Sequence, residues 1–541
     1  MYKWNILGSY DPKKEVSVSI LESRGIKDIK NFLETPSLNK SFEKFPSEFK
    51  KSLKKSQTFI KEKMKKNTHI LIFGDYDSDG INATAILYNF FKYEKKYNNV
   101  SYFIPNRFEH SYGLSKEAIG DALKDTGDEK VLFITVDVGI TAYDQVSYIK
   151  DLGHSIVLTD HHQKPDKVPE ADCLLWSDDV CGSVISWILS KALGSKDTSS
   201  VANAAVATVT DLLPMTGFNR VIVKKGLEVM NSNPPMAFKK MLQISNTPDA
   251  EVTTYTLGWL IGPRLNASGR LESSDVSIKL LTEKDEKVVE ELAKKLDSKN
   301  IERQEKTLEM YEMASEVDET NIPKIIFSVN KKYHEGVIGL VSAKLTQEYY
   351  RPSVVISLDD GYGKGSVRSI SGINIIEVLR KFDDLFVDLG GHPMAGGFTI
   401  EEKNIPEMIK KVTNYIEKEY GDEVFTPILD VDLEIPSEII TTQILDDIDK
   451  LKPFGMGNNQ PVFLTKNLGI VSCDIIGKDK THLKLKLYKD EKYLKCVFFG
   501  GAKYEKDFAV GEKIDLVYTL NKNEYNGNTY VDLIVKDFRK V

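Results

Sequence analysis

Three short β-like runs in the first third of the chain each end in an acidic motif, and this repetition constrains the fold more than any other feature. His69–Phe73 leads to Asp75, and Val131–Thr135 leads to Asp137. A third, β-branched run leads into Thr159–His162, which reads Thr-Asp-His-His. Helical patterns separate the runs, which is typical of βαβ units in a doubly wound parallel sheet. Because ligands of such sheets bind outside the carboxyl ends of the strands, we expect the acidic motifs to form one site there.

The later parts of the chain show other patterns. Residues 275–317 are rich in Leu, Glu and Lys and contain no Pro or Gly, which predicts one or two long helices. A second α/β region is expected to contain strands at 325–329 and 353–358 and Gly-rich turns at 361–372 and 390–397. Further on, His482–Leu487 alternates Leu with Lys, and Asn526-Gly527 separates two β-like runs. The alternation and the hairpin signal together predict a small β-barrel.

These patterns predict an α/β protein made of several segments. We divide it into an N-terminal extension packed on the core (1–66), a first α/β domain (67–274), a connecting helix (275–320), a smaller α/β domain (321–425) and a C-terminal β-barrel (426–541).

Composition excludes several classes of protein. The chain is 41% hydrophobic and 28% charged, as ordinary globular proteins are. No apolar run approaches the roughly 18–20 residues that a membrane helix needs. The N-terminus shows no apolar stretch of a secretory signal, so we expect a cytoplasmic protein. The four cysteines form no Cys-x-x-Cys pair, so we expect reduced structural thiols and neither a thiolate zinc site nor a disulfide framework.

Charge is distributed unevenly along the chain. The net charge is −7, but residues 450–541 contain 17 Lys+Arg and 11 Asp+Glu, a net +6, which leaves −13 for residues 1–449. An acidic body suits divalent metal ions and a basic module suits a polyanion. Ordinary scatter of surface charge is the alternative.

The acidic motif after the first run is the richest in candidate ligands. Asp75, Asp77 and Asp79 alternate, so on an extended segment they project to the same side and at least two can reach one ion. Close carboxylates repel one another unless a cation or a proton intervenes. The spacing also resembles the start of an EF-hand, but the twelfth position holds Ile86 where calcium loops have Glu.

The two histidines change the interpretation of the other acidic residues. Asp137 alone would most often be a helix cap. With His161 and His162 nearby in the fold, it becomes a candidate ligand, and Asp160 could orient one imidazole from outside the ligand set. Mixed oxygen and imidazole ligands favour Mn²⁺ or Mg²⁺ over zinc. Asp211 follows a long apolar stretch and is either an N-cap or a further ligand.

The order of motifs resembles a known family, the RecJ-type single-strand-specific exonucleases of the Asp-His-His (DHH) phosphoesterase superfamily. The resemblance covers roughly residues 20–541. It is carried by the motifs Gly74–Gly80, Asp137, Asp160–His162, Asp211 with Asn219-Arg220, Gly262–Arg270, His334–Gly339, Ser366–Ser369, Gly390–Phe398 and Pro453–Asn458. Phe73 departs from the pattern, because relatives often have His there.

The resemblance implies a doubly wound DHH domain, a connecting helix, a DHHA1 domain that closes over the substrate, and a C-terminal OB-fold. It implies that two divalent ions, Mn²⁺ or Mg²⁺, are bound by Asp77, Asp79, Asp137, His161 and Asp211, with Asp137 bridging and Asp75 nearby. His162 would contact the scissile phosphate. The substrate-binding positions would be Arg107, Asn266, Arg270, Ser366, Arg368 and His392, with the arginines and Ser366 on DNA phosphates that include a 5′-terminal one.

These expectations predict a metal-dependent exonuclease that removes nucleotides from single-stranded DNA in the 5′ to 3′ direction by in-line attack of an activated water. Expected partners are single-stranded DNA and a single-strand-binding protein or helicase, with no membrane partner and a monomeric chain. Two alternatives stay open: a related phosphodiesterase for short oligonucleotides or cyclic dinucleotides, and a binding scaffold that has lost its metals. In the barrel, Phe454, Tyr488, Tyr493, Phe498 and Phe499 are candidates for stacking on bases, with Phe498 favoured as core.

Overall fold

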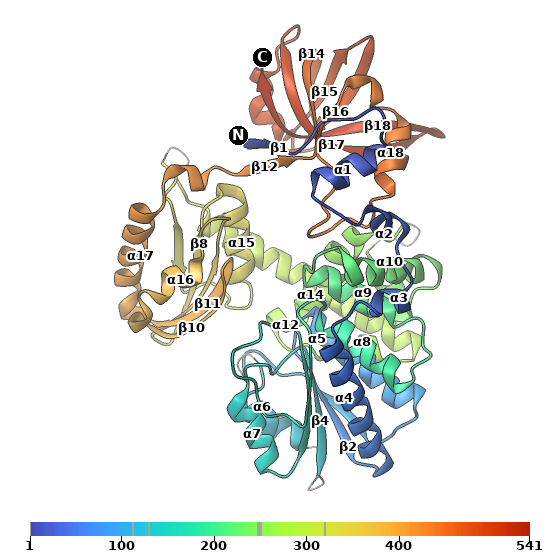
Figure 1. Ribbon diagram of the computed structural model, residues 1–541. Helices are drawn as coiled ribbons and strands as arrows, with labels where there is room; N and C mark the ends of the chain where they lie inside the picture. The colour runs from blue at the N-terminus through green and yellow to red at the C-terminus, as the bar shows by residue number, and fades with distance from the viewer. Residues whose placement is uncertain (1, 111–112, 125, 128–129, 246–250, 319–320) are drawn as a thin grey trace.

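Three bodies make up the molecule (Figure 1): an α/β body at the bottom of the view, a smaller α/β body at the left and a β-barrel at the top. The computed structural model describes residues 2–541 except 111–112, 125, 128–129, 246–250 and 319–320. None of the helices in this described part combines the length and apolarity that a membrane crossing requires. Cys173, Cys181, Cys473 and Cys496 are all free thiols, as predicted.

The first sheet has five parallel strands in the order β3-β2-β4-β5-β6, which confirms the predicted doubly wound sheet. Its strands are β2 (His69–Phe73), β3 (Val100–Phe103), β4 (Val131–Val136), β5 (Ser155–Asp160) and β6 (Cys173–Trp176). After β3 the chain returns to the other side of β2, so the strand order reverses between β2 and β4. Ligands of doubly wound sheets bind at such a switch point, beyond the carboxyl ends of the strands.

Helices cover both faces of this sheet. Ile70 and Ile72 of β2 belong to the larger core, together with α4 (Ser47–Lys65), α5 (Ser78–Asn89) and α8 (Gly182–Leu193). Leu71 and Phe73 face the opposite core, formed with α6 (Lys116–Leu123) and α7 (Tyr143–Asp151). Strands buried on both faces explain why these runs are continuously apolar in the sequence.

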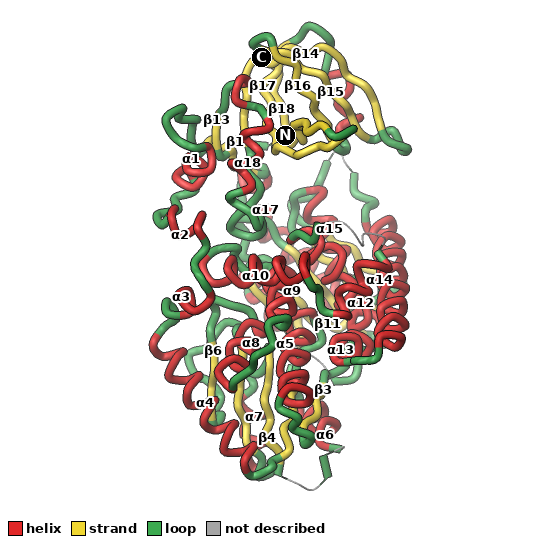
Figure 2. The backbone as a smooth tube through the Cα atoms, turned by 90° about the vertical axis from the view of Figure 1, so that its right-hand side faces the viewer, coloured by secondary structure: helices red, strands yellow, loops and turns green. Residues whose placement is uncertain are grey.

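A helical region follows the sheet and leads to the connecting helices. It contains α9 (Val201–Thr210), α10 (Gly217–Ser232), α11 (Met236–Ile244), the π-helix η2 (Thr256–Ile261) and α12 (Gly262–Leu271). The connection consists of α13 (Asp275–Thr282) and α14 (Glu286–Ala314). Asp285 separates them and caps α14, because its Oδ1 accepts hydrogen bonds from the N–H groups of Lys287 and Val288. The 29 residues of α14 span about 43 Å, and Met310 and Ala314 near its end pack into the core of the second α/β body. Figure 2 shows α14 beside α12 and α13.

The second sheet has the order β10-β11-β9-β8-β7, and only β7 and β8 are parallel. Its elements are β7 (Ile326–Asn330), α15 (Ile338–Tyr349), β8 (Ser353–Asp359), β9 (Tyr362–Arg368), α16 (Ile375–Arg380), β10 (Phe386–His392), β11 (Ala395–Glu401) and α17 (Ile405–Glu419). The prediction of Gly-rich turns at 361–372 and 390–397 is therefore wrong, because most of these residues belong to strands. Gly365 explains the misleading composition: a Cβ there would lie 2.1 Å from the ring of Phe398 on the neighbouring strand.

The C-terminal body is a closed five-stranded barrel, as predicted. Its strands are β14 (Phe463–Ile476), β15 (His482–Lys489), β16 (Lys492–Phe498), β17 (Lys513–Tyr525) and β18 (Asn528–Lys540), and β14 closes the ring by pairing with both β15 and β17. Along β15 the leucines are buried and the lysines exposed. Asn526 and Gly527 have φ values of 51° and 76°, which make the tight turn between β17 and β18.

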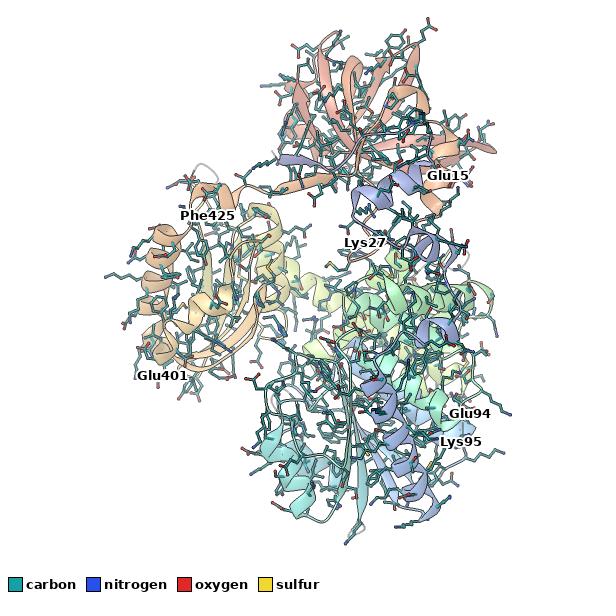
Figure 3. All side chains as sticks on the ribbon, viewed as in Figure 1. Glu15, Lys27, Glu94, Lys95, Glu401 and Phe425 are labelled. Atoms are coloured by element: carbon teal, nitrogen blue, oxygen red, sulfur yellow. The ribbon has the colours of Figure 1, made fainter. Side chains whose placement is uncertain are left out.

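The N-terminal segment differs from its predicted position. All of residues 1–66 were expected on the catalytic core, but the first part packs on the barrel. β1 (Lys3–Ile6) pairs with β12 (Ile428–Val431) at the base of the barrel. Residues of α1 (Val16–Ser23), with Phe32 of α2 (Ile29–Glu34), share the barrel's hydrophobic core, and the chain joins the first α/β body only afterwards. Figure 3 shows Glu15 beside the barrel, where Lys450 Nζ lies 2.8 Å from its carboxylate.

A buried arginine fastens the barrel to the first α/β body. Arg220 of α10 donates hydrogen bonds to the backbone carbonyls of residues 450–453, at distances of 2.7–3.3 Å, and to that of Phe32. Its guanidinium also lies 4.1 Å from the centre of the Phe32 ring. One side chain thus joins three segments that are distant in the sequence.

Candidate metal centre

The loop between β2 and α5 places three carboxylates at the switch point of the first sheet. Asp77 caps α5, because its Oδ1 accepts hydrogen bonds from the N–H groups of Asp79 (2.9 Å) and Gly80 (3.1 Å). Asp75 and Asp79 are both buried. Gly80 is required for this packing, since a Cβ there would lie 2.5 Å from backbone atoms of Asp75.

The side chain of Asp79, which belongs to α5, also contacts the N-terminus of α8. Its two carboxylate oxygens accept hydrogen bonds of 2.7 Å from the N–H groups of Gly182 and Ser183. The first turn of a helix favours an anion, so this contact stabilises the ionised carboxylate inside the protein.

Asp137 follows β4 in an unusual backbone conformation. Its φ is 64°, a left-handed value that costs a non-glycine residue free energy. The side chain is buried, and Oδ1 accepts no hydrogen bond. Gly182 lies so close that a Cβ there would be 2.7 Å from Asp137 Cβ. A strained residue with an unsatisfied buried oxygen is typical of a functional position.

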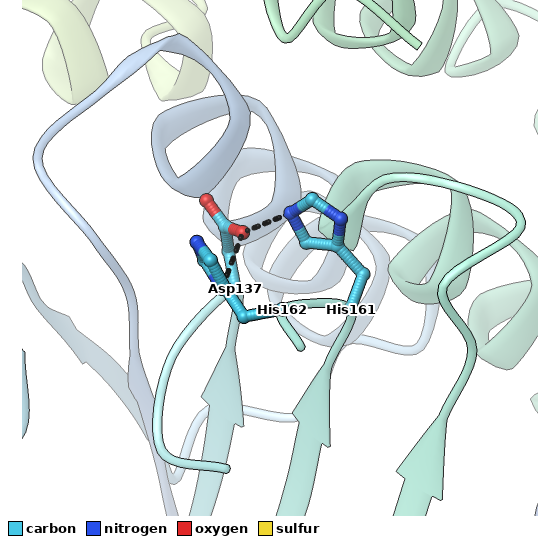
Figure 4. Close-up of side chains that lie close together, drawn as sticks. All are labelled: Asp137, His161 and His162. Atoms are coloured by element: carbon cyan, nitrogen blue, oxygen red, sulfur yellow. Dashed lines mark ion pairs between the residues drawn. The ribbon is translucent and has the colours of Figure 1, made fainter. Parts of the chain in front are cut away.

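The end of β5 brings both histidines to Asp137 (Figure 4). His161 Nε2 lies 3.0 Å from Asp137 Oδ1, and His162 Nδ1 lies 4.0 Å from the same oxygen. Asp160 lies behind them: its Oδ1 is 2.7 Å from His162 Nδ1, and its Oδ2 accepts a hydrogen bond from the N–H of Ile140. Asp160 therefore fixes the orientation of the His162 ring.

Asp211 reaches the same place from the helical region. It is the C-terminal cap residue of α9, so the alternative interpretation as an N-cap is wrong. Its Oδ2 lies 3.5 Å from His161 Nε2, which is also 3.6 Å from Asp79 Oδ2.

The candidate ligand atoms form three overlapping groups. In each group the atoms lie within 4.8 Å of one another, and the groups are Asp75, Asp77 and Asp137; Asp137, His161 and His162; and Asp79, His161 and Asp211. Asp137 and His161 each belong to two groups. This overlap suits two neighbouring cations that share Asp137.

The carboxylates destabilise one another's charge. Burial raises the pKa of Asp75 to about 8, and the charge of Asp77 adds to the effect. Burial raises the pKa of Asp211 to about 9, with Asp79 and Asp77 contributing. The pKa values of Asp77 and Asp137 are also raised, first by burial and then by neighbouring carboxylates. Divalent cations would remove this repulsion, and they suit a set of carboxylate oxygens and imidazole nitrogens.

The two imidazoles differ in charge. Burial lowers the pKa of His161, which favours the neutral ring that metals bind. Burial also lowers the pKa of His162, but the hydrogen bond and charge of Asp160 outweigh it and raise that pKa to about 9. The pair thus offers one neutral and one cationic ring.

Several arginine side chains lie beside the carboxylates. Burial, together with the charges of Arg107, Arg303 and Arg368, lowers the pKa of Arg270 to about 10. Arg107 is in the loop after β3 and lies over the Tyr76 ring at 4.8 Å. Among the described residues, no ion pair involves any of these four arginines, so their charges are available to an anion.

The arginines come from different kinds of element. Only Arg107 lies in a turn, whereas Arg270 is near the end of α12 and Arg368 ends β9. Arg368 Nη1 lies 3.2 Å from Ser366 Oγ. The N-terminus of α15 lies beside this pair, since a Cβ at Gly339 would be 3.1 Å from both side chains. A serine, an arginine and a helix N-terminus form a suitable cradle for phosphate.

Sequence reasoning missed Arg303. It lies on α14, in a lysine-rich stretch with no recognisable motif. One signal was present: only 10 of the chain's 73 Lys and Arg residues are arginine, and Arg303 is the single arginine of α14. A chain that uses lysine for surface charge tends to place arginine where its planar fork is needed.

Three other positions differ in their surroundings. Asn266 lies on α12, and its buried Oδ1 accepts no hydrogen bond. His392, at the end of β10, is exposed and forms no described contact with the other candidate residues. Phe73 is fully buried and packs 5.5 Å from the Phe103 ring, so its position holds no ligand.

Family models match each of the three bodies. The model of the DHH family, N-terminal domain, matches residues 69–216. The DHHA1 domain model matches 321–418, and the RecJ OB domain model matches 431–537. The three models follow one another along the chain in the order that the motifs predicted.

Known proteins agree with these matches. The single-stranded-DNA-specific exonuclease RecJ of Bacillus subtilis (strain 168) is 32% identical over 501 residues, which are 90% of this chain and 63% of that protein, so the chain spans less than two thirds of that relative. The crystal structure of RecJ with Mn²⁺ from Thermus thermophilus has a TM-score of 0.84 and 24% identity over 100% of this chain and 80% of that one. A manganese-bound exonuclease RecJ structure has a TM-score of 0.60 and 27% identity over 69% of this chain and 96% of that one. The chain therefore combines a DHH domain, a DHHA1 domain and a RecJ OB domain, and it has the fold of RecJ.

Proposed function

We propose that the chain is an exonuclease that hydrolyses the phosphodiester bonds of single-stranded DNA from the 5′ end, with two divalent ions, Mn²⁺ or Mg²⁺. The observation that carries the proposal is the position of Asp137. Its buried Oδ1 accepts no hydrogen bond and belongs to two adjacent groups of candidate ligands. The relatives named exonuclease RecJ, one of them bound to manganese, support the same reaction.

The donor set fits the proposed ions. Asp77, Asp79, Asp137, His161 and Asp211 would hold them, with Asp75 within reach of Asp77 and Asp137. Bound divalent ions supply a water of lowered pKa and offset the charge that develops on the phosphoryl group. The raised pKa values of the carboxylates show how unfavourable the cluster is on its own.

The side chains around the ligands position the substrate. Asp160 engages Nδ1 of His162, so Nε2 is the ring nitrogen that would meet the scissile phosphate. Arg107 and Arg270 would offset phosphate charge near the ligands, while Ser366 and Arg368 would hold the 5′-terminal phosphate beside the α15 N-terminus. Asn266 offers an amide to the same strand, and the exposed His392 would reach DNA only if the second α/β body closes over it.

Each predicted segment has its own proposed role. The catalytic part is 67–274, the connecting helix is 275–320, the substrate-binding domain is 321–425 and the DNA-gripping barrel is 426–541. We also propose that the chain acts as a cytoplasmic monomer and that a single-strand-binding protein or a helicase recruits it. The net positive charge of residues 450–541 supports a polymeric substrate over a cyclic dinucleotide.

The decisive experiment uses one oligonucleotide labelled at either end. With Mn²⁺, the 5′-labelled strand should release labelled mononucleotide at once, whereas the 3′-labelled strand should shorten gradually. EDTA should stop both reactions, and a duplex of the same sequence should resist. Release from the 3′ end first would overturn the polarity, and hydrolysis of only di- or cyclic nucleotides would assign the chain to the alternative activity.

A further inference from the structure

Two large aromatic side chains are exposed close to the candidate metal centre. Tyr255 and Trp259 are 66% and 69% exposed, and no other tyrosine or tryptophan whose exposure the structure describes is as exposed. Their rings stack on each other, with centroids 6.1 Å apart and an interplanar angle of 24°. Trp259 lies in the π-helix η2 and Tyr255 is the residue that caps its N-terminus, and π-helices are frequent at functional sites.

The pair lines a cavity of about 590 Å³. Its wall begins at Leu212, the neighbour of Asp211, and includes Arg270. Phe454 and Met456, which precede the C-terminal barrel, also line it, and the carbonyl of Met456 accepts a hydrogen bond from the N–H of Met215. The cavity therefore borders both the neighbourhood of the metal centre and the segment that leads to the barrel.

The wall of the cavity also carries polar groups that suit DNA. Arg303 and Arg270 both line it, and neither forms an ion pair within the described residues. Asn266 also lines it, and its buried Oδ1 has no hydrogen-bond partner. Stacked aromatic rings next to unpaired cations are the combination that grooves for single strands use.

We propose that Tyr255 and Trp259 form a base-stacking platform for the part of the DNA strand that lies between the metal centre and the barrel, and that Arg303 binds a phosphate of the same part. The proposal rests on the proposed exonuclease function and adds to it the place where bases are held. Stacking accepts any base, so the platform would grip the strand without sequence preference.

The surroundings favour single-stranded DNA over a protein partner. A protein docking site of this size would need a mainly apolar centre, whereas this cavity includes two guanidinium groups, those of Arg270 and Arg303. A duplex would not offer unstacked bases to the rings. A flexible single strand supplies both a flat apolar surface and regular negative charge.

The test measures binding of a fluorescent 20-nucleotide strand with a 5′ phosphate, in EDTA so that it stays intact. One abasic site is moved along the strand from the 5′ end. With the wild-type protein, an abasic site opposite the platform should weaken binding about five-fold or more, within a window of a few positions. With Trp259→Ala, intact DNA should bind about ten-fold more weakly, and the same abasic positions should add less than two-fold.

Matched variants separate stacking from folding. Trp259→Phe keeps a ring and should restore most of the affinity, whereas Tyr255→Ala should resemble Trp259→Ala. Tyr93→Ala is the control, because Tyr93 is also exposed (44%) but lies beyond the far end of α5 from the metal centre. Arg303→Gln should reduce the slope of log affinity against log salt by about 0.7.

The outcomes also distinguish this inference from the function on which it rests. If the wild-type chain cleaves single strands with Mn²⁺ but Trp259→Ala and Tyr255→Ala bind like wild type, the base-stacking proposal is wrong and the proposed exonuclease function is retained. If the abasic penalty persists in Trp259→Ala, the bases stack elsewhere. If the wild-type chain neither binds nor cleaves single strands, the proposed function itself fails.

Discussion

Asp79 and Ser183 join the two helices that begin at the metal centre. The N–H of Ser183, in the first turn of α8, donates a 2.7 Å hydrogen bond to Asp79 Oδ1, and Ser183 Oγ donates one of 2.8 Å to the backbone carbonyl of Asp79 in α5. Both residues are buried. Asp79 therefore has two roles: it is a candidate metal ligand, and it fixes α8 against α5.

Asp79→Asn should lower stability even without metal. An amide group in this position would point its own N–H toward the donors of Gly182 or Ser183 and leave a buried donor unsatisfied, at a cost of about 1–3 kcal/mol. Denaturant unfolding in EDTA measures this cost apart from metal binding. Ser183→Ala is the matched control, which should lose about 1 kcal/mol and keep most of the activity. Unchanged stability of Asp79→Asn in EDTA would contradict the structural role.

Asp137→Asn should have the opposite effect on the metal-free protein. The amide removes one charge from a repelling cluster, and Asn tolerates the left-handed φ of 64°, so stability in EDTA should stay equal or rise. Mn²⁺ at 100 times its dissociation constant should stabilise the wild-type protein by about 2.7 kcal/mol but should hardly stabilise the variant. Thermal unfolding with and without Mn²⁺ makes the comparison. Cleavage should fall at least about 100-fold, and retention of a tenth of wild-type turnover would refute the bridging role.

Arg368→Gln should impair recognition of the 5′ phosphate. Loss of a charge-assisted hydrogen bond costs about 1.5–3 kcal/mol, so KM for a 5′-phosphorylated strand should rise about ten-fold or more. KM for a strand with a 5′ hydroxyl should change much less. Arg380→Gln, an exposed arginine of the same body, is the control. Equal losses on both strands would remove Arg368 from the recognition of the 5′ end.

Arg220→Leu should loosen the barrel from the first α/β body. Several backbone carbonyls would lose a buried cationic donor, which should cost at least about 3 kcal/mol. Calorimetry should show a separate, earlier transition for the barrel, and activity on long strands should fall more than activity on very short ones. Lys225→Leu tests a more exposed cation on the same helix and should leave a single transition. If Arg220→Leu unfolds in one step at the wild-type temperature, the Arg220 side chain does not hold the barrel against the first α/β body.

The sequence predicted the first sheet and its site well because the signals are local. The strands β2, β4 and β5 are continuous apolar runs, and each is followed within a few residues by the acidic or histidine motif that it positions. Parallel packing then brings those motifs to one edge without further information. The roles of the individual side chains stay predictions until variants such as Asp137→Asn are measured.

The predictions that the structure contradicts, and the residue that the sequence did not reveal, have physical explanations. Gly363 and Gly365 look like turn residues, but they occupy β9 because the neighbouring strand places side chains such as Phe398 over them. Arg303 resembles the solvated lysines around it, and only the tertiary fold brings it near Arg270. The division of residues 1–66 between two bodies depends on contacts such as Lys3 with Ile428, which leave no trace in either local sequence.

The pairing of β1 with β12 has a consequence for synthesis on the ribosome. The strand β1 leaves the exit tunnel long before its partner, which lies more than 400 residues downstream, and a similar length of chain separates α1 from α18 (Thr442–Asp449). At 5–20 residues per second, the delay is about 20–90 s. During that time the apolar side chains of Val16, Ile20 and Leu21 have no native surface to cover, so the nascent chain offers a binding site to chaperones until β12 and α18 have been synthesised.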